Sequence, residues 1–135
     1  MTDGSTSTGR TPADVTDPIR VFVVDDYPAF LRSVASVIDA TPGFTLVGTA
    51  ETGADALDAL EGRSDVDLVL LDVNLPDLSG IEVARRSAEQ RAVIVLMSTS
   101  DPADLPTFDR SVAGFLAKEQ LTTATLRALW DAATS

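Results

Sequence analysis

Several residues that could do chemistry follow short apolar stretches of the sequence, at places where strands are expected to end. They are three acids, one hydroxyl and one lysine: Asp25, Asp26, Asp72, Ser98 and Lys118. If the strands are neighbours, these side chains meet in one site, where crowded carboxylates repel and raise the pKa of at least one of them unless a cation binds. The chemistry that fits is attack of an aspartate on a phosphoryl group, with Mg²⁺ and the lysine neutralising charge on the transferred oxygens.

The residue types that the sequence lacks narrow this chemistry further. Its 135 residues include no histidine and no cysteine, which excludes a Ser-His-Asp triad, a thiol nucleophile, disulfides and zinc bound by imidazole or thiolate. Any metal is therefore expected to be a hard cation held by oxygen ligands, and Mg²⁺ is the first candidate.

Each of these residues has a simpler explanation when it is taken alone. Paired acids such as Asp25 and Asp26 often form turns or cap helices, and a serine after a strand is often a cap. A lone lysine is usually a solvated surface residue. The functional interpretation therefore rests on the combination, because neighbouring parallel strands bring all five residues to one edge of a sheet.

The apolar pattern predicts strands that alternate with helices. Five short apolar stretches are typical of buried strands: residues 19–24, 44–50, 66–71, 92–97 and 113–117. Helical spacing and capping residues predict helices at residues 28–40, between Thr52 and Gly62, from Ser79 or Gly80 onward, and from Leu121 to Ala133. This alternation predicts an α/β domain with a parallel sheet and helices on both faces, whose ligands bind beyond the carboxyl ends of the strands.

Composition indicates one acidic globular domain. The formal net charge is −11 and the pI is about 4.1, which argues against binding to nucleic acid or to an anionic membrane. No apolar run approaches the roughly 18 residues that a membrane span requires. Residues 1–18 are polar and have no apolar central stretch, so we expect a disordered tail rather than a signal peptide, a folded domain over residues 19–135 and a cytoplasmic location.

The sequence after the polar tail resembles the receiver domains of bacterial two-component response regulators. The matching residues are Asp25-Asp26, Asp72-x-x-x-Pro76-x-x-x-Gly80 within LVLLDVNLPDLSG, Ser98 and Lys118. The resemblance implies a doubly wound, flavodoxin-like (βα)5 fold with a five-stranded parallel sheet in the order 2-1-3-4-5. The turn from Pro76 to Gly80 is then expected to keep Asp72 exposed beside a metal ion.

The resemblance also implies how phosphate and metal are bound. Asp72 would accept a phosphoryl group from the phosphohistidine of a sensor histidine kinase or a phosphotransfer protein. Mg²⁺ would be bound by Asp26, Asp72 and the backbone carbonyl of Asn74, with Asp25 acting mainly through water. Lys118 would pair with the phosphoryl group or with Asp72 itself.

A conformational switch is implied in the same way. Ser98 would turn toward the phosphate and Phe115 would rotate inward behind it, so that phosphorylation biases an existing equilibrium between two states. Protein partners would then detect the face built from helix four, strand five and helix five. Phe115 is also explained more simply as a core residue of the fifth strand.

The sequence departs from the receiver pattern in three places. Pro102 and Pro106 fall where helix four is expected, and a proline inside a helix costs about 3 kcal/mol, so we expect helix four to be short, displaced or partly unwound. Thr99 stands where the family has a smaller residue, so access to Asp72 is expected to be hindered. Glu119 replaces the commoner proline after the site lysine.

Three hypotheses about function remain open. The first is a stand-alone receiver that acts through an unidentified protein partner, with no enzyme activity beyond its own phosphotransfer and dephosphorylation. No DNA-binding module follows the last predicted helix, so no direct DNA binding is expected, and whether the chain forms a homodimer is left open. The second is a receiver-like interaction module that acts independently of phosphorylation. The third, a phosphohydrolase of the haloacid dehalogenase type, is disfavoured because Asp25 and Asp26 are adjacent rather than spaced Asp-x-Asp.

Overall fold

Strands and helices alternate in the computed structural model, which describes residues 17–87, 92–99 and 112–134. The strands are β1 (Ile19–Val24), β2 (Phe44–Ala50), β3 (Leu68–Asp72), β4 (Val93–Ser98) and β5 (Gly114–Ala117). The helices are α2 (Pro28–Ala40), α3 (Gly53–Leu60), α4 (Gly80–Arg86), α5 (Thr123–Thr134) and the short 3-10 helix η3 (Lys118–Gln120). In this described part of the chain, no helix has the length and apolar character needed to cross a membrane.

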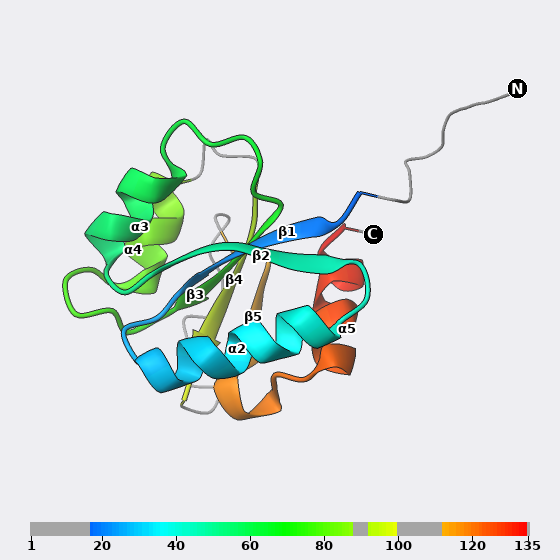
Figure 1. Ribbon diagram of the computed structural model, residues 1–135. Coiled ribbons are helices and arrows are strands. Elements are labelled where there is room, and N and C mark those ends of the chain that lie inside the picture. Colours follow the sequence, from blue (N-terminus) through cyan, green and yellow to red (C-terminus); the bar gives the residue numbers. More distant parts are fainter. Residues whose placement is uncertain (1–16, 88–91, 100–111, 135) are drawn as a thin grey trace, which may run out of the picture.

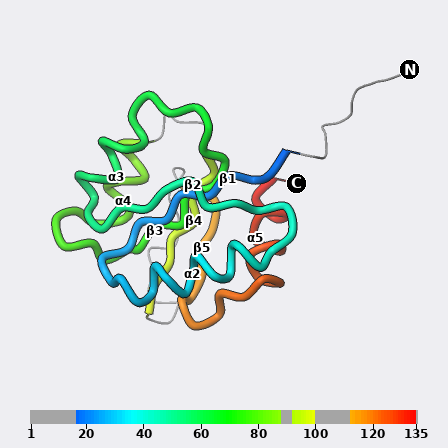
Figure 2. Tube along the Cα trace, in the orientation of Figure 1, coloured from blue at the N-terminus to red at the C-terminus, as the bar shows by residue number. Residues whose placement is uncertain are grey.

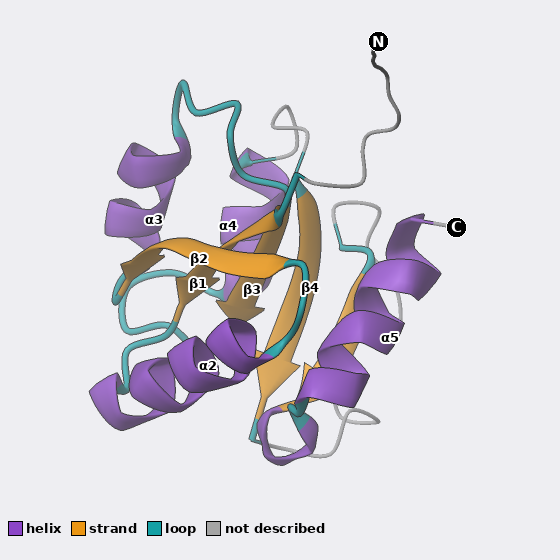
Figure 3. Cartoon of the chain, turned by 45° about the vertical axis from the view of Figure 1, so that its right-hand side comes forward, coloured by secondary structure: helices purple, strands orange, loops and turns teal. Residues whose placement is uncertain are grey.

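The five strands form one parallel sheet in the order β2-β1-β3-β4-β5, which confirms the predicted α/β fold and strand order. Helices α2 and α5 cover one face of the sheet, and α3 and α4 cover the other (Figures 1 and 3). Because all five strands are parallel, their carboxyl ends meet at a single edge of the sheet. The Cα trace in Figure 2 shows α2 and α5 side by side on one face of the sheet.

The core is divided by the sheet into two layers. Along β1, Val21 and Val23 pack toward α2 and α5, whereas Phe22 and Val24 pack toward α3 and α4. These four side chains are at most 1% exposed, and complete burial of such side chains contributes about 1.5–3 kcal/mol each. Burial on both faces explains why the strand sequence is continuously apolar rather than alternating.

Local capping explains where the helices begin. Pro28 occupies the first turn of α2, where its missing N–H costs nothing. The Thr52 hydroxyl accepts a hydrogen bond from the Asp55 amide at the start of α3, and the Ser79 hydroxyl accepts one from the Glu82 amide at the start of α4. The predicted starts of these three helices are therefore confirmed.

Two predicted boundaries are wrong by a few residues. The third strand begins at Leu68 rather than residue 66 and continues through Asp72, which pairs with Met97 of β4. The last helix begins at Thr123 rather than Leu121, because Thr122 and Thr125 each accept a hydrogen bond from the other's amide, at 3.2 and 2.7 Å, and so form a cap. The predicted irregular helix four lies outside the described residues, as do residues 1–16 of the predicted tail.

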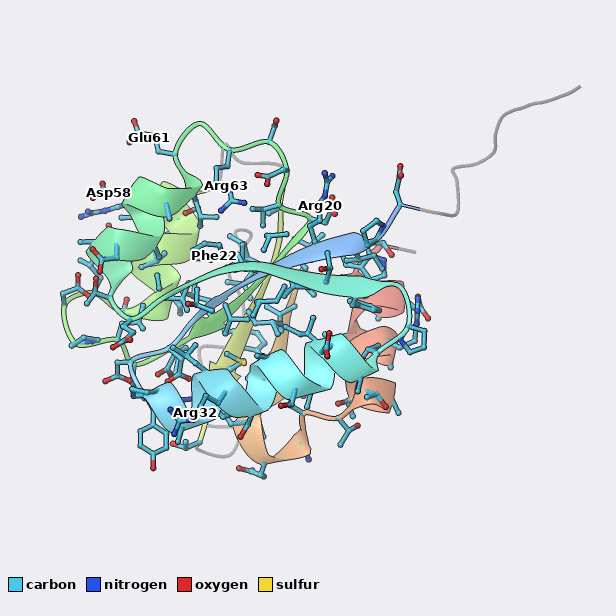
Figure 4. All side chains as sticks on the ribbon, viewed as in Figure 1. Arg20, Phe22, Arg32, Asp58, Glu61 and Arg63 are labelled. Atoms are coloured by element: carbon cyan, nitrogen blue, oxygen red, sulfur yellow. The ribbon has the colours of Figure 1, made fainter. Side chains whose placement is uncertain are left out.

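Charged pairs stabilise the amino-terminal edge of the sheet, opposite the strand ends that carry the candidate site. The Arg63 guanidinium lies 5.9 Å from the centre of the Phe22 ring and pairs with Asp65 at 2.7 Å (Figure 4). This pairing lowers the pKa of Asp65 to about 2. Arg20 binds Asp67 through both its backbone amide and its side chain, at 2.8 and 3.1 Å. These contacts fix the segment that leads into β3.

Gly80 is required by a close approach of two backbone segments. A Cβ atom at this position would lie 2.5 Å from the Asp72 carbonyl oxygen and 2.8 Å from the Val73 Cα. We expect Gly80→Ala to lower the free energy of unfolding by at least about 1–3 kcal/mol, the usual cost of overpacking. Urea unfolding would measure this change. Gly114→Ala is the matched control, because its Cβ would meet no atom closer than 3.8 Å, and a similar loss in both variants would contradict the explanation.

Candidate functional site

The five residues singled out in the sequence come from four adjacent strands. Asp25 and Asp26 directly follow β1, Asp72 ends β3, Ser98 ends β4, and Lys118 directly follows β5. Since β1, β3, β4 and β5 are consecutive in the sheet, the fold places these residues at one edge. The side chains that contact one another there in the described structure include Asp25, Asp72 and Lys118.

Three carboxylates of this edge form a cluster suited to a divalent cation. One oxygen each of Asp25, Asp26 and Asp72 can be chosen so that all three lie within 4.8 Å of one another. Opposite ligands of octahedral Mg²⁺ are separated by roughly 4.2 Å, twice the usual metal–oxygen distance, so small side-chain movements would bring these oxygens into range. The donor set consists of hard oxygens, as Mg²⁺ requires. The residues present therefore fit this ion.

Asp25 is fully buried, and both of its carboxylate oxygens have partners. Oδ1 accepts a hydrogen bond from the Tyr27 amide at 2.9 Å, and Oδ2 lies 2.5 Å from Nζ of Lys118. A buried carboxylate is stable only when it is paired in this way. Asp26, by contrast, is exposed and free of such burial. Oδ2 is paired with the lysine by charge and receives no hydrogen bond from the described residues, so the role of Asp25 toward a metal stays a prediction.

Asp72 is buried, with 6% of its side chain exposed, so the expectation that the following turn keeps it exposed is wrong. Its pKa is raised, chiefly because burial disfavours the charged form, while repulsion from Asp25 adds a smaller part. The Asn74 amide, which donates to Oδ1 at 3.1 Å, and the Lys118 ammonium lower the pKa in part. Crowding predicted the direction of this shift, but burial is its main cause.

Lys118 connects the two buried acids. Its Nζ lies 2.5 Å from Oδ2 of Asp25 and 3.4 Å from Oδ2 of Asp72, and 12% of its side chain is exposed. The same ammonium lies 4.7 Å from the centre of the Phe30 ring on α2, within the range of a cation–π interaction. The lysine is therefore held in place from three sides, with its charge directed at the carboxylate cluster.

The remaining predicted residues surround this centre at different depths. Ser98 is 1% exposed and its backbone pairs with Ala117 of β5, while Thr99, the next residue, is exposed. Thr99 lines a shallow groove of about 450 Å³ together with Tyr27, Phe30 and Lys118. Phe115 is partly buried and packs against the core between the sheet and α3 and α4, as the simpler explanation predicts.

Asn74 lies at the exposed start of the loop between β3 and α4. Its backbone forms an isolated bridge with Ser79, and the Gly80 amide donates to the Val73 carbonyl at 2.9 Å. The loop is thereby closed into a tight turn beside Asp72, which leaves Asn74 exposed at the same edge as the carboxylates.

Two residues near the centre were not identified from the sequence. Phe30 has the spacing of an ordinary core residue of α2, and only the structure places it against Lys118. Tyr27 is 63% exposed and forms one wall of the groove that Lys118 also lines. Its position directly after the acidic pair was the available signal, because an exposed aromatic residue beside a polar site often contacts a partner.

Sequence comparison with known proteins matches the part of the chain that contains these residues. The family described as "Response regulator receiver domain" matches residues 21–129. The nitrate/nitrite response regulator protein NarP of Escherichia coli strain K12 is 34% identical over 106 residues, which is 76% of this chain and 49% of NarP. The NarL protein of the same strain is 30% identical over 121 residues, which is 87% of this chain and 56% of NarL. The chain thus spans about half the length of these relatives.

This chain matches two solved structures over nearly the whole length of their chains. The signal receiver domain of the NarL response regulator from Mycobacterium tuberculosis superposes with a TM-score of 0.73 at 31% identity, covering 88% of this chain and 98% of that one. CheY6 from R. sphaeroides, in complex with the P1 domain of CheA3, gives a TM-score of 0.72 at 30% identity, covering 88% and 99%.

The raised pKa of Asp72 has a measurable effect on stability. Because the folded state holds this proton more tightly than the unfolded state, the charge of Asp72 destabilises the fold as pH rises above the ordinary value of 3.8. We expect Asp72→Asn to raise the urea midpoint at pH 7 in the presence of EDTA, with the gain shrinking as pH falls through the raised pKa of Asp72 and lost below 3.8.

Asp77→Asn provides a control of opposite sign. Hydrogen bonds from the Gly53 and Ala54 amides lower the pKa of Asp77, so its charge stabilises the fold above its ordinary pKa and that contribution is lost as pH falls. We expect this variant to lower the midpoint at pH 7. An Asp72→Asn variant that is less stable than wild type at pH 7 would contradict our account of its burial.

Proposed function

Because this chain belongs to the response regulator receiver domain family, we propose that it is a phosphoryl-accepting switch of a two-component system, with Asp72 as the phosphoacceptor. One observation carries the proposal. The Asp72 carboxylate lies in a cluster with Asp25 and Asp26, within 4.8 Å between chosen oxygens, and has the Lys118 ammonium 3.4 Å away. Such a site can place a carboxylate nucleophile beside two positive charges, those of the lysine and a bound cation.

The proposed step is transfer of a phosphoryl group from a phosphohistidine. An oxygen of Asp72 forms the new bond to phosphorus while the phosphorus–nitrogen bond breaks. The electron pair of the broken bond stays on the nitrogen of the donor's imidazole. Asp26, Asp72 and the carbonyl of Asn74 would hold Mg²⁺, which would supply positive charge toward the transferred oxygens. Lys118 supplies the second positive charge.

The ion pairs of Lys118 must rearrange during this step. In the described structure its Nζ contacts Asp25 more closely than Asp72, at 2.5 against 3.4 Å. A phosphoryl group on Asp72 adds negative charge and acceptor oxygens at the nearby carboxylate, so the ammonium gains a stronger partner there. We propose that the Ser98 hydroxyl donates a hydrogen bond to the same oxygens. The Phe115 side chain would then rotate inward behind Ser98. The surface that changes then includes β5 and α5, and a protein partner would detect phosphorylation by binding this surface.

Donor binding is proposed at the groove beside α2. Its walls include the exposed Tyr27 and the partly buried Phe30, and Lys118 connects it to the carboxylate cluster. The CheY6 structure, which resembles this chain, was determined with the P1 domain of the kinase CheA3. By analogy, a sensor histidine kinase or phosphotransfer protein is the proposed donor, and the chain itself is proposed to work in the cytoplasm as a signalling protein rather than an enzyme with its own substrate.

The acidic surface bears on the choice of downstream partner. With a net charge of −11, the chain is proposed to act through protein contacts and not through direct binding to DNA. The complete cluster of three acids and a lysine favours a phosphoacceptor over an interaction module that acts independently of phosphorylation. The adjacent acids Asp25 and Asp26 likewise disfavour the haloacid dehalogenase alternative.

Phosphorylation from a small donor tests the proposal. We expect the wild-type chain, incubated with acetyl phosphate and MgCl₂, to give a retarded band on a phosphate-affinity gel, and Asp72→Asn to give none. Omission of Mg²⁺ should abolish the band, because the repulsion among three carboxylates and the incoming phosphate is then uncompensated. Wild type and Asp72→Asn behaving alike in this assay would rule out Asp72 as the phosphoacceptor.

Thr99 provides a test of access to the site. Its exposed side chain lines the same groove as Lys118, so a smaller residue should open the approach to Asp72. We expect Thr99→Ala to raise severalfold both the rate of phosphorylation by acetyl phosphate and the rate of dephosphorylation. Thr99→Val, which keeps the size of the side chain and removes its hydroxyl, is the control. If both variants accelerate the reaction equally, the hydroxyl rather than the bulk of Thr99 controls the rate.

A further inference from the structure

The carboxylate of Asp77 binds the first turn of a helix that is distant in sequence. Asp77 lies in the loop between β3 and α4, yet its Oδ1 accepts from the Gly53 amide at 2.7 Å and its Oδ2 from the Ala54 amide at 2.9 Å. The first amides of a helix have no acceptor within the helix, so they need one from outside. Thr52 supplies the acceptor for the next amide, that of Asp55, at 3.0 Å. The first amides of α3 thus donate both to Thr52, which directly precedes the helix, and to Asp77 in the loop.

Packing holds the loop and the helix together at the same point. A Cβ atom on Gly53 would lie 2.9 Å from Cβ of Leu78 and 3.0 Å from a methyl group of Val83. Glycine is therefore required for α3 to approach this closely, and Leu78 packs against the core between the sheet, α3 and α4. The hydrogen bonds of Asp77, whose own side chain is exposed, therefore lie beside a tight contact between the loop and α3.

The loop that Asp77 anchors is the one that borders the carboxylate cluster. On one side of Asp77, the Asn74 amide donates to Oδ1 of Asp72 at 3.1 Å. On the other side, Ser79 bridges back to Asn74, and the Gly80 amide donates to the Val73 carbonyl at 2.9 Å. Asp77 stands at the tip of this turn, so its attachment to α3 determines where the turn lies relative to the strand end.

We propose that Asp77 is a positioning residue for the metal site, which holds the loop so that the Asn74 carbonyl and the Asp72 carboxylate face the same cation. This inference rests on the proposed function, because it takes Asp72 and Asn74 as ligands of Mg²⁺. The contact with two amide donors also lowers the pKa of Asp77, which keeps the side chain charged and able to accept both hydrogen bonds at neutral pH. Replacement of residues that orient metal ligands in this way commonly lowers metal affinity by about 10–100-fold.

The competing explanation is that Asp77 only stabilises α3. A substitution at Thr52 distinguishes the two explanations. Thr52 is the N-cap residue of the same helix, and its hydroxyl contacts the Asp55 amide rather than the loop. Removal of either cap should weaken the start of α3, whereas only the loss of Asp77 should release the loop beside Asp72. Thr52→Ala is therefore the matched control for Asp77→Ala.

The experiment is a titration of the full chain with MgCl₂, followed by the backbone amide NMR signals of Asp26 and Asn74. We expect the apparent Kd of wild type to rise roughly tenfold in Asp77→Ala and by less than about twofold in Thr52→Ala. Asp77→Asn keeps one oxygen acceptor and should give an intermediate Kd. Urea midpoints of the variants, measured in parallel, show how much each change affects folding.

Each outcome decides a different question. An unchanged Kd in Asp77→Ala, or an equal rise in Asp77→Ala and Thr52→Ala, overturns the positioning role. If wild type binds Mg²⁺ but takes no phosphate from acetyl phosphate, the proposed function fails while the comparison of the two variants remains valid. If wild type binds no Mg²⁺ at all, both the metal site and the role of Asp77 are wrong.

Discussion

The ion pair of Lys118 with two buried carboxylates is the interaction on which the site depends. Its ammonium lies 2.5 Å from Asp25 and 3.4 Å from Asp72, and the exposed fractions of the three side chains are only 12%, 0% and 6%. Three acids and one lysine leave a charge of −2 when all are ionised, since three negative charges and one positive charge are present. The lysine reduces the repulsion without removing it, so the site retains an attraction for a cation.

The rest of the domain holds these charges together against their repulsion. The parallel sheet fixes the strand ends, and apolar layers pack on both faces of β1 and β3 beneath Asp25 and Asp72. Phe30 restrains Lys118 from the side of α2, while Asp77 and Gly80 restrain the loop on the side of α3 and α4. The two helical layers thus each restrain one side of the site.

The sequence predicts the features of this protein that arise from local pattern. Branched apolar runs located the strands, and the caps Thr52 and Ser79 located two helix starts, because each depends on residues within a few positions. The start of α5 was missed although the Thr122–Thr125 cap is also local. Features that depend on the packed structure could not be predicted: the burial of Asp72, the ring of Phe30 beneath Lys118, and the reach of Asp77 across more than twenty residues to α3.

Chemical identification of the phosphorylated residue decides whether Asp72 is the phosphoacceptor. After reaction with acetyl phosphate and Mg²⁺, reduction with borohydride converts an aspartyl phosphate to homoserine, which mass spectrometry can place in the tryptic peptide of residues 64–85. We expect homoserine at Asp72 alone, and only when Mg²⁺ was present during phosphorylation. Homoserine at Asp65, Asp67 or Asp77 of the same peptide, or modification that does not depend on Mg²⁺, would contradict this expectation.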